Sequence, residues 1–117
     1  MNAAIYARYS SENQRPESID DQISACRKFA HDHGYAVGEE HVFTDQAASG
    51  ARKDRIGLAT LLATSETRSF EIVLVDDLSR LARDNYLMLS VLAELRFNGV
   101  RVMSVADGLD SKRAVTI

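Results

Sequence analysis

The segment I-Y-A-R-Y-S-S, residues 5–11, has the pattern of a short buried strand that ends on an arginine, an aromatic ring and two hydroxyls. The polar run of residues 12–16 follows it directly. In a sheet of parallel strands, ligands bind just beyond the carboxyl ends of the strands. The sequence therefore predicts that Arg8 and Ser10 present a cation and a hydroxyl at such an end.

Strand and helix patterns alternate along the rest of the chain. The strongest strand, F-E-I-V-L-V at residues 70–75, is a near-continuous apolar run, which is typical of strands with helices on both faces. This alternation predicts an α/β fold with a mainly parallel central sheet flanked by helices. We expect strands at residues 3–9, 35–43 (firmest at 42–44 and ending in Thr44-Asp45), 70–75 and 100–106, and helices at residues 18–34, 55–67 and 85–98.

Length and composition indicate one globular domain over residues 1–117. A chain of 117 residues can bury a conventional core, roughly two thirds of its surface. No apolar run approaches the ~20 residues that span a bilayer. The single cysteine, Cys26, cannot form an internal disulfide, so we expect a reducing, cytoplasmic location.

The distribution of charge favours local phosphate chemistry. The net charge is −3, so the chain as a whole is not a basic nucleic-acid binder. Positive charge is nevertheless focused, because seven of the 14 Lys and Arg residues lie at or just beyond predicted strand ends. These residues are Arg8, Arg15, Arg52, Lys53, Arg55, Arg80 and Arg83.

Arginines from three segments are directed at one predicted sheet end: Arg8, Arg55, and the pair Arg80 and Arg83. Several guanidinium groups on one phosphate stabilise the extra negative charge of a phosphoryl-transfer transition state. Ser10 beside them is a candidate nucleophile, although no histidine is placed to act as its base. From the residues alone, solvated surface arginines and a turn-capping serine remain an open alternative.

We expect neither a cofactor nor a metal. The chain lacks both the G-x-x-x-x-G-K-[ST] phosphate loop and the G-x-G-x-x-G dinucleotide motif. His31 and His33 are two residues apart on a predicted helix and so point in different directions, and His41 stands alone. Cys26 falls on the apolar stripe of the first helix, where a core role is the simplest interpretation.

The helix predicted at residues 85–98 has more apolar surface than one core contact requires. One arc can pack on the sheet, whereas the other needs either a further helix of the same chain or another subunit. The first arc contains Leu87, Met88, Val91, Leu92 and Leu95, and the second contains Tyr86, Leu89, Ala93 and Phe97.

Five separated motifs carry a family resemblance. They are Y-A-R-Y-S-S at residues 6–11, Gln22, F-T-D-Q-A-A-S-G at 43–50, D-R-I-G-L at 54–58 and L-S-R-L-A-R-D at 78–84. In this order and spacing the chain resembles the resolvase/invertase family of serine site-specific recombinases, and the long loop of residues 11–18 suits the large serine recombinase type. The resemblance implies the resolvase catalytic-domain fold, which has a flavodoxin-like architecture.

The resemblance also implies a reaction. Ser10 would attack a DNA phosphodiester, leaving a 5′-phosphoserine link and a 3′-hydroxyl, without metal or ATP. Arg8, Arg80 and Arg83 are similar to phosphate-binding arginines of the family, and Arg55 is similar to the fourth. Strand exchange in the family takes place in a DNA-bound tetramer.

Two further residues match positions with supporting roles. Asp45 is similar to an acidic residue at the end of the second strand that orients an arginine. Gln22 is similar to a glutamine that helps to arrange the active-site loop. Both therefore join the expected site.

The chain departs from the family pattern at one position and in its extent. Small resolvases usually carry an aspartate directly before the first arginine of the D-R-L-x-R motif, where this chain has Ser79. Asp76 and Asp77 lie nearby in sequence, but the group that protonates the leaving 3′-oxygen stays unassigned. The family's dimerisation helix and DNA-binding domain are absent from these residues, so we expect weak DNA binding by the catalytic domain alone.

Two other interpretations stay open from the sequence. One is a non-catalytic protein-interaction module that keeps the fold and uses the second apolar arc of the helix at residues 85–98. The other is a phosphohydrolase or nucleotide-binding domain of flavodoxin-like order, which the missing metal site and phosphate loop disfavour.

Overall fold

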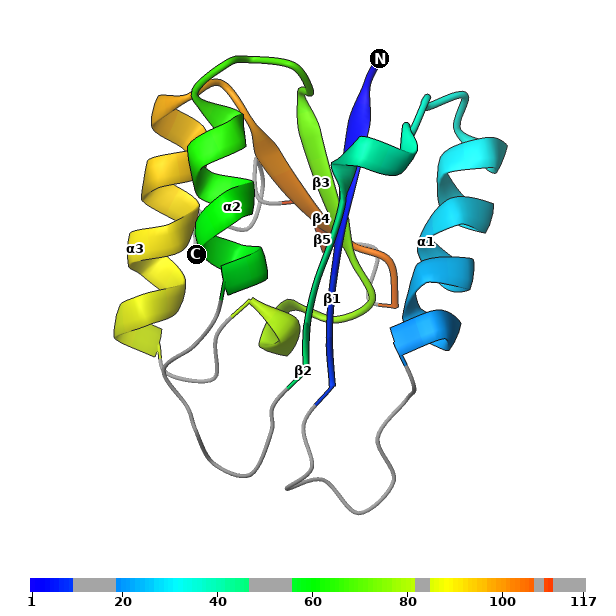
Figure 1. Cartoon of the computed structure of the whole chain (residues 1–117), viewed down its shortest axis with the longest axis horizontal. Coiled ribbons are helices and arrows are strands. Elements are labelled where there is room, and N and C mark those ends of the chain that lie inside the picture. Colours follow the sequence, from blue (N-terminus) through cyan, green and yellow to red (C-terminus); the bar gives the residue numbers. More distant parts are fainter. Residues whose placement is uncertain (10–18, 47–55, 82–84, 107–108, 111–117) are drawn as a thin grey trace.

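A computed structural model of the chain describes residues 1–9, 19–46, 56–81, 85–106 and 109–110. Strands and helices alternate, as the sequence predicts (Figure 1). The elements are β1 (Ala3–Tyr9), α1 (Ile19–Asp32), η1 (Glu39–His41), β2 (Val42–Gln46), α2 (Ile56–Ser65), β3 (Ile72–Val75), η2 (Leu78–Arg80), α3 (Asn85–Phe97), β4 (Arg101–Ser104) and β5 (Leu109–Asp110). Within these described ranges, no helix has the length and apolar character that crossing a membrane requires.

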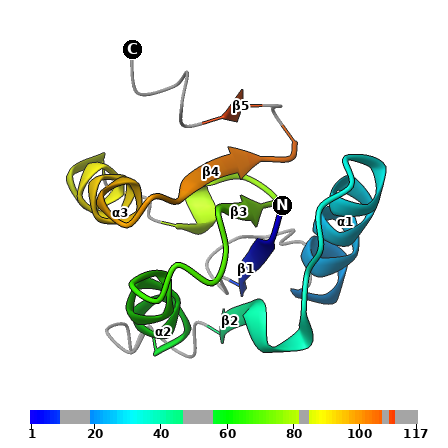
Figure 2. The ribbon, with the colours of Figure 1, turned by 90° about the horizontal axis from the view of Figure 1, so that it is seen from above.

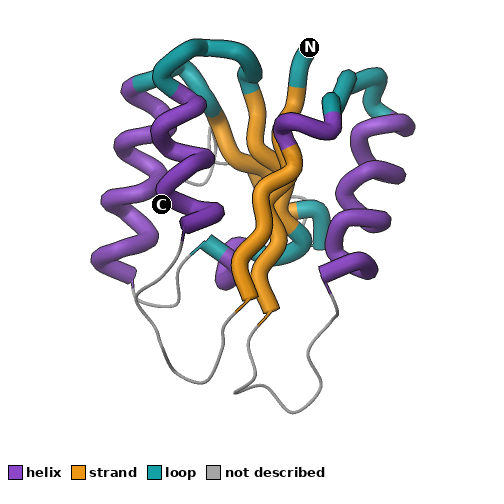
Figure 3. Tube along the Cα trace, viewed as in Figure 1, coloured by secondary structure: helices purple, strands orange, loops and turns teal. Residues whose placement is uncertain are grey.

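The strands form one sheet in the order β2-β1-β3-β4-β5. Figure 3 shows strands of this sheet, in orange, between the helices. β2, β1, β3 and β4 are parallel, whereas β5 pairs antiparallel with β4. This is the flavodoxin-like strand order, so the predicted fold class is confirmed. The antiparallel β5 lies beyond the last strand that the sequence predicts, at residues 100–106.

Helices cover both faces of the sheet, α1 on one side and α2 and α3 on the other (Figure 2). Alternate side chains of β1 point to opposite faces of the sheet and pack in the two hydrophobic clusters there. Ile5 joins the cluster beneath α1, while Tyr6 joins Leu61 of α2 and Leu95 of α3 in the opposite cluster. Because β1 is covered on both sides, residues 3–7 have no exposed side chain.

The second strand is shorter than its sequence predicts. β2 begins only at Val42, after a short 3-10 turn in which His41 N donates to Gly38 O at 3.0 Å. Before that turn, Ala36 makes a single parallel bridge to Asn2. The prediction of a strand from residue 35 was wrong, because the chain must first cross from the end of α1 to the sheet edge. The other predicted helices and strands begin and end within two residues of their expected bounds.

α3 has the two faces that its sequence predicts, with one exception. Val91 and Leu95 are buried, and Met88 and Leu92 lie partly buried against the same cluster. Leu87, which the prediction assigned to the buried arc, is 40% exposed. At 100° per residue it lies at the margin of that arc, about 80° from Leu95, so the sheet does not cover it.

Cys26 of α1 is a core residue, as its position on the apolar stripe predicts. Its side chain has no exposed surface. Burial, and secondarily the negative charge of Asp76, raises the pKa of the Cys26 thiol from its ordinary 9.0 to about 12. At neutral pH the folded chain therefore holds this sulfur as an unreactive thiol.

We predict that Cys26 makes the chain lose stability at alkaline pH. Because its folded pKa is raised, the unfolded thiol ionises first as pH increases, and this favours unfolding. The free energy of unfolding should fall by up to about 1.4 kcal/mol per pH unit, starting near pH 9.0 and ending near pH 12. Urea unfolding at pH 8 and pH 10.5 measures this change.

The control is Cys26→Ala, which should be less stable at pH 8 but should lose less stability between the two pH values. Other titrating groups are the same in both chains, so they cancel in the comparison. Parallel pH dependences for the two chains would contradict the prediction.

Candidate active site

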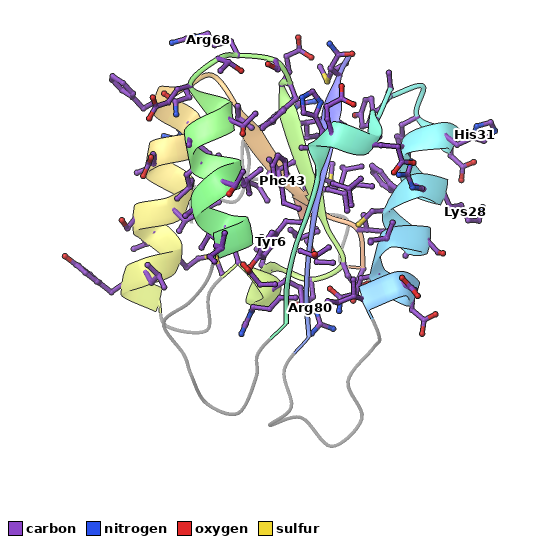
Figure 4. All side chains as sticks on the ribbon, in the orientation of Figure 1. Tyr6, Lys28, His31, Phe43, Arg68 and Arg80 are labelled. Carbon is purple, nitrogen blue, oxygen red and sulfur yellow. The ribbon has the colours of Figure 1, made fainter. Side chains whose placement is uncertain are left out.

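The switch point of the sheet lies between β1 and β3, because β2 pairs on one side of β1 and β3 on the other. Ligands in open α/β sheets bind beyond the carboxyl ends of the strands at this point. Arg8 of β1 and Arg80 of η2 meet there: Arg8 Nε donates to Arg80 O at 3.1 Å, and Arg80 Nη1 donates to Arg8 O at 3.4 Å. Figure 4 shows Arg80 at this lower end of the strands. Two of the predicted cations are thus brought together.

Gln22 of α1 clamps the main chain at Arg8. Arg8 N donates to Gln22 Oε1 and Gln22 Nε2 donates to Arg8 O, both at 3.0 Å. The register between β1 and β3 ends at Tyr6 and Val75, so Arg8 lies past the paired part of that edge. The Gln22 side chain has no exposed surface. Its amide therefore supplies, from a helix, hydrogen bonds that a neighbouring strand would otherwise give.

Asp45 of β2 ties the start of α2 to the sheet. Its Oδ1 accepts from Gly57 N at 2.7 Å, and its Oδ2 accepts from Leu58 N at 2.9 Å and from the Tyr6 hydroxyl at 2.7 Å. The first N–H groups of a helix have no partner within the helix, and negative charge is favoured there. Asp45 is 8% exposed, so its carboxylate depends on these donors. It acts as a cap that comes from a distant part of the sequence.

Gly57 permits this contact. A Cβ at position 57 would lie 2.3 Å from Thr44 O and 3.0 Å from Asp45 Oδ1. The obstructing oxygen of Thr44 belongs to the main chain of β2 and cannot swing aside. The glycine is thus required for close approach of the two backbones.

An acidic residue also lies against Arg80. Asp76 follows β3 directly, and its Oδ2 is 3.5 Å from Arg80 Nη2. The side chains of Arg80 and Asp76 are 12% and 18% exposed, respectively. Solvent screens this ion pair less than a pair on the open surface.

The predicted site residues fall into two groups. Arg8, Arg80, Gln22 and Asp45 lie at the carboxyl end of the sheet, as expected. The expected role of Asp45 as the partner of an arginine stays a prediction. Ser10, Arg55 and Arg83, together with the side chain of Ser79, lie outside the part of the chain that the structure describes.

Sequence reasoning missed the contributions of Tyr6 and Gly57. Tyr6 was treated only as part of a buried strand, although a tyrosine among aliphatic strand residues signals a hydroxyl that needs a buried partner. Gly57 lies within the D-R-I-G-L motif, and the motif by itself gives it no role. Its function depends on the distance between α2 and β2, which no local pattern reveals.

The arrangement can bind an anion at the sheet end. Each of the two guanidinium groups donates to the main-chain carbonyl of the other arginine and so has a restricted position. An oxyanion can therefore meet them without first ordering two long side chains. Among the described residues, no three His, Cys, Asp or Glu side chains converge as a metal site. The positions of Arg8 and Arg80 fit the binding of a phosphate by arginine side chains.

The family model described as "Resolvase, N terminal domain" matches residues 3–116 of this chain. The Transposon Tn3 resolvase of Escherichia coli is 37% identical over 106 residues, covering 91% of this chain and 51% of that protein. The R46 site-specific recombinase of Escherichia coli is 34% identical, covering 96% of this chain and 55% of that protein. The chain thus spans about half the length of these relatives.

Solved structures of recombinases are also similar to this chain. The N-terminal catalytic domain of TP901-1 integrase superposes with a TM-score of 0.83 at 30% identity, covering 98% of this chain and 85% of the other. A resolvase family site-specific recombinase from Streptococcus pneumoniae gives 0.81 at 27% identity, covering 97% and 77%. The C-terminal catalytic domain of ISC1926 TnpA, an IS607-like serine recombinase, gives 0.74 at 34% identity, covering 90% and 70%.

We predict that Gly57→Ala destabilises the chain and loosens the start of α2. The added methyl group would overlap Thr44 O, so α2 must shift and weaken its hydrogen bonds to Asp45. Such overpacking costs about 1–3 kcal/mol in the free energy of unfolding. Urea unfolding measures the loss, and hydrogen exchange at Leu58 N should become faster.

Gly38→Ala is the matched control. The atoms nearest to its added Cβ would be those of the Glu40 carboxylate, on an exposed side chain that can rotate away. The backbone at Gly38 has φ −84° and ψ 156°, which alanine adopts without strain. We expect a change below about 0.5 kcal/mol. Equal effects of the two substitutions would refute the close-approach role of Gly57.

Proposed function

Because this chain belongs to the resolvase N-terminal domain family, we propose that it is the catalytic domain of a serine site-specific recombinase. It cuts and rejoins DNA strands through a covalent link to Ser10. The observation that carries the proposal is the mutual bonding of Arg8 and Arg80 at the sheet's switch point, two and seventy residues from Ser10 in sequence. An anion site of this kind suits a phosphodiester.

The reaction is a transfer of a phosphoryl group from one oxygen to another. Ser10 Oγ attacks the phosphorus and gives up its proton, a bond from Oγ to phosphorus forms, and the bond from phosphorus to the 3′-oxygen breaks. The leaving 3′-oxygen takes up a proton and becomes a hydroxyl, while the 5′-phosphate stays on the serine. Since one phosphodiester replaces another, the 3′-hydroxyl of an exchanged strand can reverse the step without an external energy source.

Arginines stabilise the transition state in this proposal. Arg8, Arg55, Arg80 and Arg83 surround the phosphate, where the negative charge increases as the serine attacks. Charge-assisted hydrogen bonds of this type contribute about 1.5–3 kcal/mol each. The contribution to rate comes from having the donors in place before the reaction begins.

Gln22 and Asp45 act on position rather than on the phosphate. Gln22 fixes the main chain at Arg8, two residues before Ser10 in sequence. Asp45 fixes the first turn of α2, which follows Arg55 directly. Each thereby fixes main chain that is close in sequence to a residue that would contact DNA, Ser10 for Gln22 and Arg55 for Asp45.

Double-stranded DNA is the proposed substrate, but not one that this domain holds tightly by itself. With a net charge of −3, the chain has too little positive charge for strong backbone binding. We assign tight binding to a dimerisation helix and a DNA-binding domain that lie C-terminal to the catalytic domain in the complete recombinase. A DNA substrate and the reduced, buried Cys26 both suit a cytoplasmic location.

Self-association uses the second apolar face of α3 in this proposal. Tyr86, Leu89 and Phe97 are 83%, 63% and 82% exposed, and Ala93 lies among them on the same arc. Contiguous apolar surface of this kind marks protein interfaces. Family relatives act as recombinases on DNA, for which a dimer or tetramer brings the cut ends together.

We predict that Ser10→Ala abolishes DNA cleavage by the full chain joined to a DNA-binding domain of known target. Without the hydroxyl no phosphoserine link can form, so the loss should exceed about 10³-fold. The measurement is the covalent protein–DNA adduct on a nicked substrate, resolved on a denaturing gel. Ser11→Ala is the matched control and should keep the adduct. Undiminished cleavage by the Ser10 variant would overturn the proposed function.

We further predict that Phe97→Glu weakens self-association. The substitution places a charge on the exposed apolar face of α3, where its burial against a second copy is unfavourable. The dissociation constant should rise by about tenfold or more, equivalent to about 1.4 kcal/mol. Sedimentation velocity over a concentration series measures it.

Ser24→Glu, on the exposed side of α1 and across the sheet from α3, controls for added charge. It should leave the dissociation constant unchanged. A Phe97→Glu chain that associates like the unaltered chain would exclude this face as the interface.

A further inference from the structure

Asp76 is a carboxylate with no role in the proposed reaction as described above. It lies at the end of β3 with its Oδ2 3.5 Å from Arg80 Nη2. Both side chains are largely buried: 18% of the Asp76 side chain and 12% of the Arg80 side chain are exposed. A pair with so little access to water keeps much of its electrostatic attraction, whereas an exposed pair loses it to solvent and side-chain entropy.

Hydrogen bonds fix the main chain at Asp76 and at the residues directly before and after it. Asp76 O accepts from Ala106 N at 2.9 Å, just beyond β4, and Val75 O accepts from Val105 N at 2.8 Å. Next in the chain, Asp77 O accepts from Arg80 N at 2.9 Å and closes the turn of η2. The carboxylate therefore projects from a fixed point of the sheet.

The guanidinium of Arg80 contacts both the Asp76 carboxylate and the main-chain carbonyl of Arg8. Its Nη2 faces Asp76 and its Nη1 donates to Arg8 O, so both ends of the planar group are held. When both Nη atoms are held, the guanidinium cannot rotate about its Nε–Cζ bond without losing one of these contacts. The guanidinium plane then has a defined orientation at the sheet end where the phosphate is proposed to bind.

We propose that Asp76 is the positioning residue of Arg80, holding its guanidinium for the phosphate through the buried ion pair at the end of β3. This inference rests on the proposed recombinase function. Asp76 acts through Arg80 and does not touch the phosphate. It also gives this chain an acidic partner for Arg80 although Ser79, directly before that arginine, is not acidic.

The first test is adduct formation by the full chain joined to a DNA-binding domain of known target. Asp76→Asn keeps the size of the side chain and removes its charge. A misplaced group at a reacting centre costs about 10- to 100-fold in rate, so we expect a single-turnover rate lower by that factor. The DNA concentration that gives the half-maximal rate should stay within about twofold, because remote DNA contacts are unaltered.

Two further variants separate positioning from general loss of negative charge. Asp76→Glu restores a carboxylate and should recover part of the rate. Asp77→Asn removes the same charge from the next residue while keeping the main-chain bond to Arg80 N, and it should retain the rate. A rate loss in Asp77→Asn as large as that in Asp76→Asn, or no rate loss in Asp76→Asn, would overturn the inference.

The second test needs no DNA and uses the full chain in solution. Nitrogen-detected NMR reports whether rotation of an arginine guanidinium is hindered, and Arg80→Lys identifies the Arg80 signals by their disappearance. We expect separate Nη signals for Arg80 in the unaltered chain and one averaged signal in Asp76→Asn. Averaged signals already present in the unaltered chain would overturn the inference.

The two tests distinguish this inference from the proposed function. An adduct that forms equally well with and without the Asp76 carboxylate removes the inference and leaves the recombinase function intact. Separate Arg80 signals that depend on Asp76, in a chain that forms no adduct on any nicked substrate, remove the function and leave the positioning of Arg80 intact.

Discussion

The carboxylate of Asp45 satisfies three donors at once, and the site depends on that contact. Tyr6 gives a hydroxyl from β1, and Gly57 and Leu58 give the first N–H groups of α2. One buried group thus joins two strands and a helix. Because an unsatisfied carboxylate in this position would be costly, α2 cannot leave β2 without a large loss of free energy.

A second set of bonds fixes the end of β1. Arg8 O accepts from both Gln22 Nε2 and Arg80 Nη1, so α1 and the turn after β3 meet at one carbonyl. Asp76 holds the other end of the Arg80 guanidinium. The residues that approach the proposed phosphate are thereby supported by main-chain atoms and rigid elements, which suits a reaction that depends on donors held in place.

Much of the fold and of the candidate site follows from local patterns. The apolar run at residues 70–75 predicted a strand covered on both faces, and β3 is buried throughout. Arg8 and Arg80 could be chosen because they lie at strand ends, whereas Gln22 and Asp45 were chosen because their positions resemble those of the family. Errors arose where local pattern and tertiary position diverge. Tyr35 and Val37 favour strands, but residues 35–41 cross from α1 to the sheet edge. Leu87 lies at the margin of its apolar arc.

By itself the sequence determined the alternation of strands and helices, and the strand ends near which Arg8 and Arg80 lie. These properties are local, because periodicity and strand ends can be counted along the chain. Only the tertiary structure decided that Asp45 caps α2, that Gly57 must lack a side chain, and that Asp76 faces Arg80. The first two contacts join distant segments, and the third depends on how the chain turns after β3. Such contacts are set by packing distances and by the hydrogen bonds that buried polar groups require, and neither is written in a short stretch of sequence.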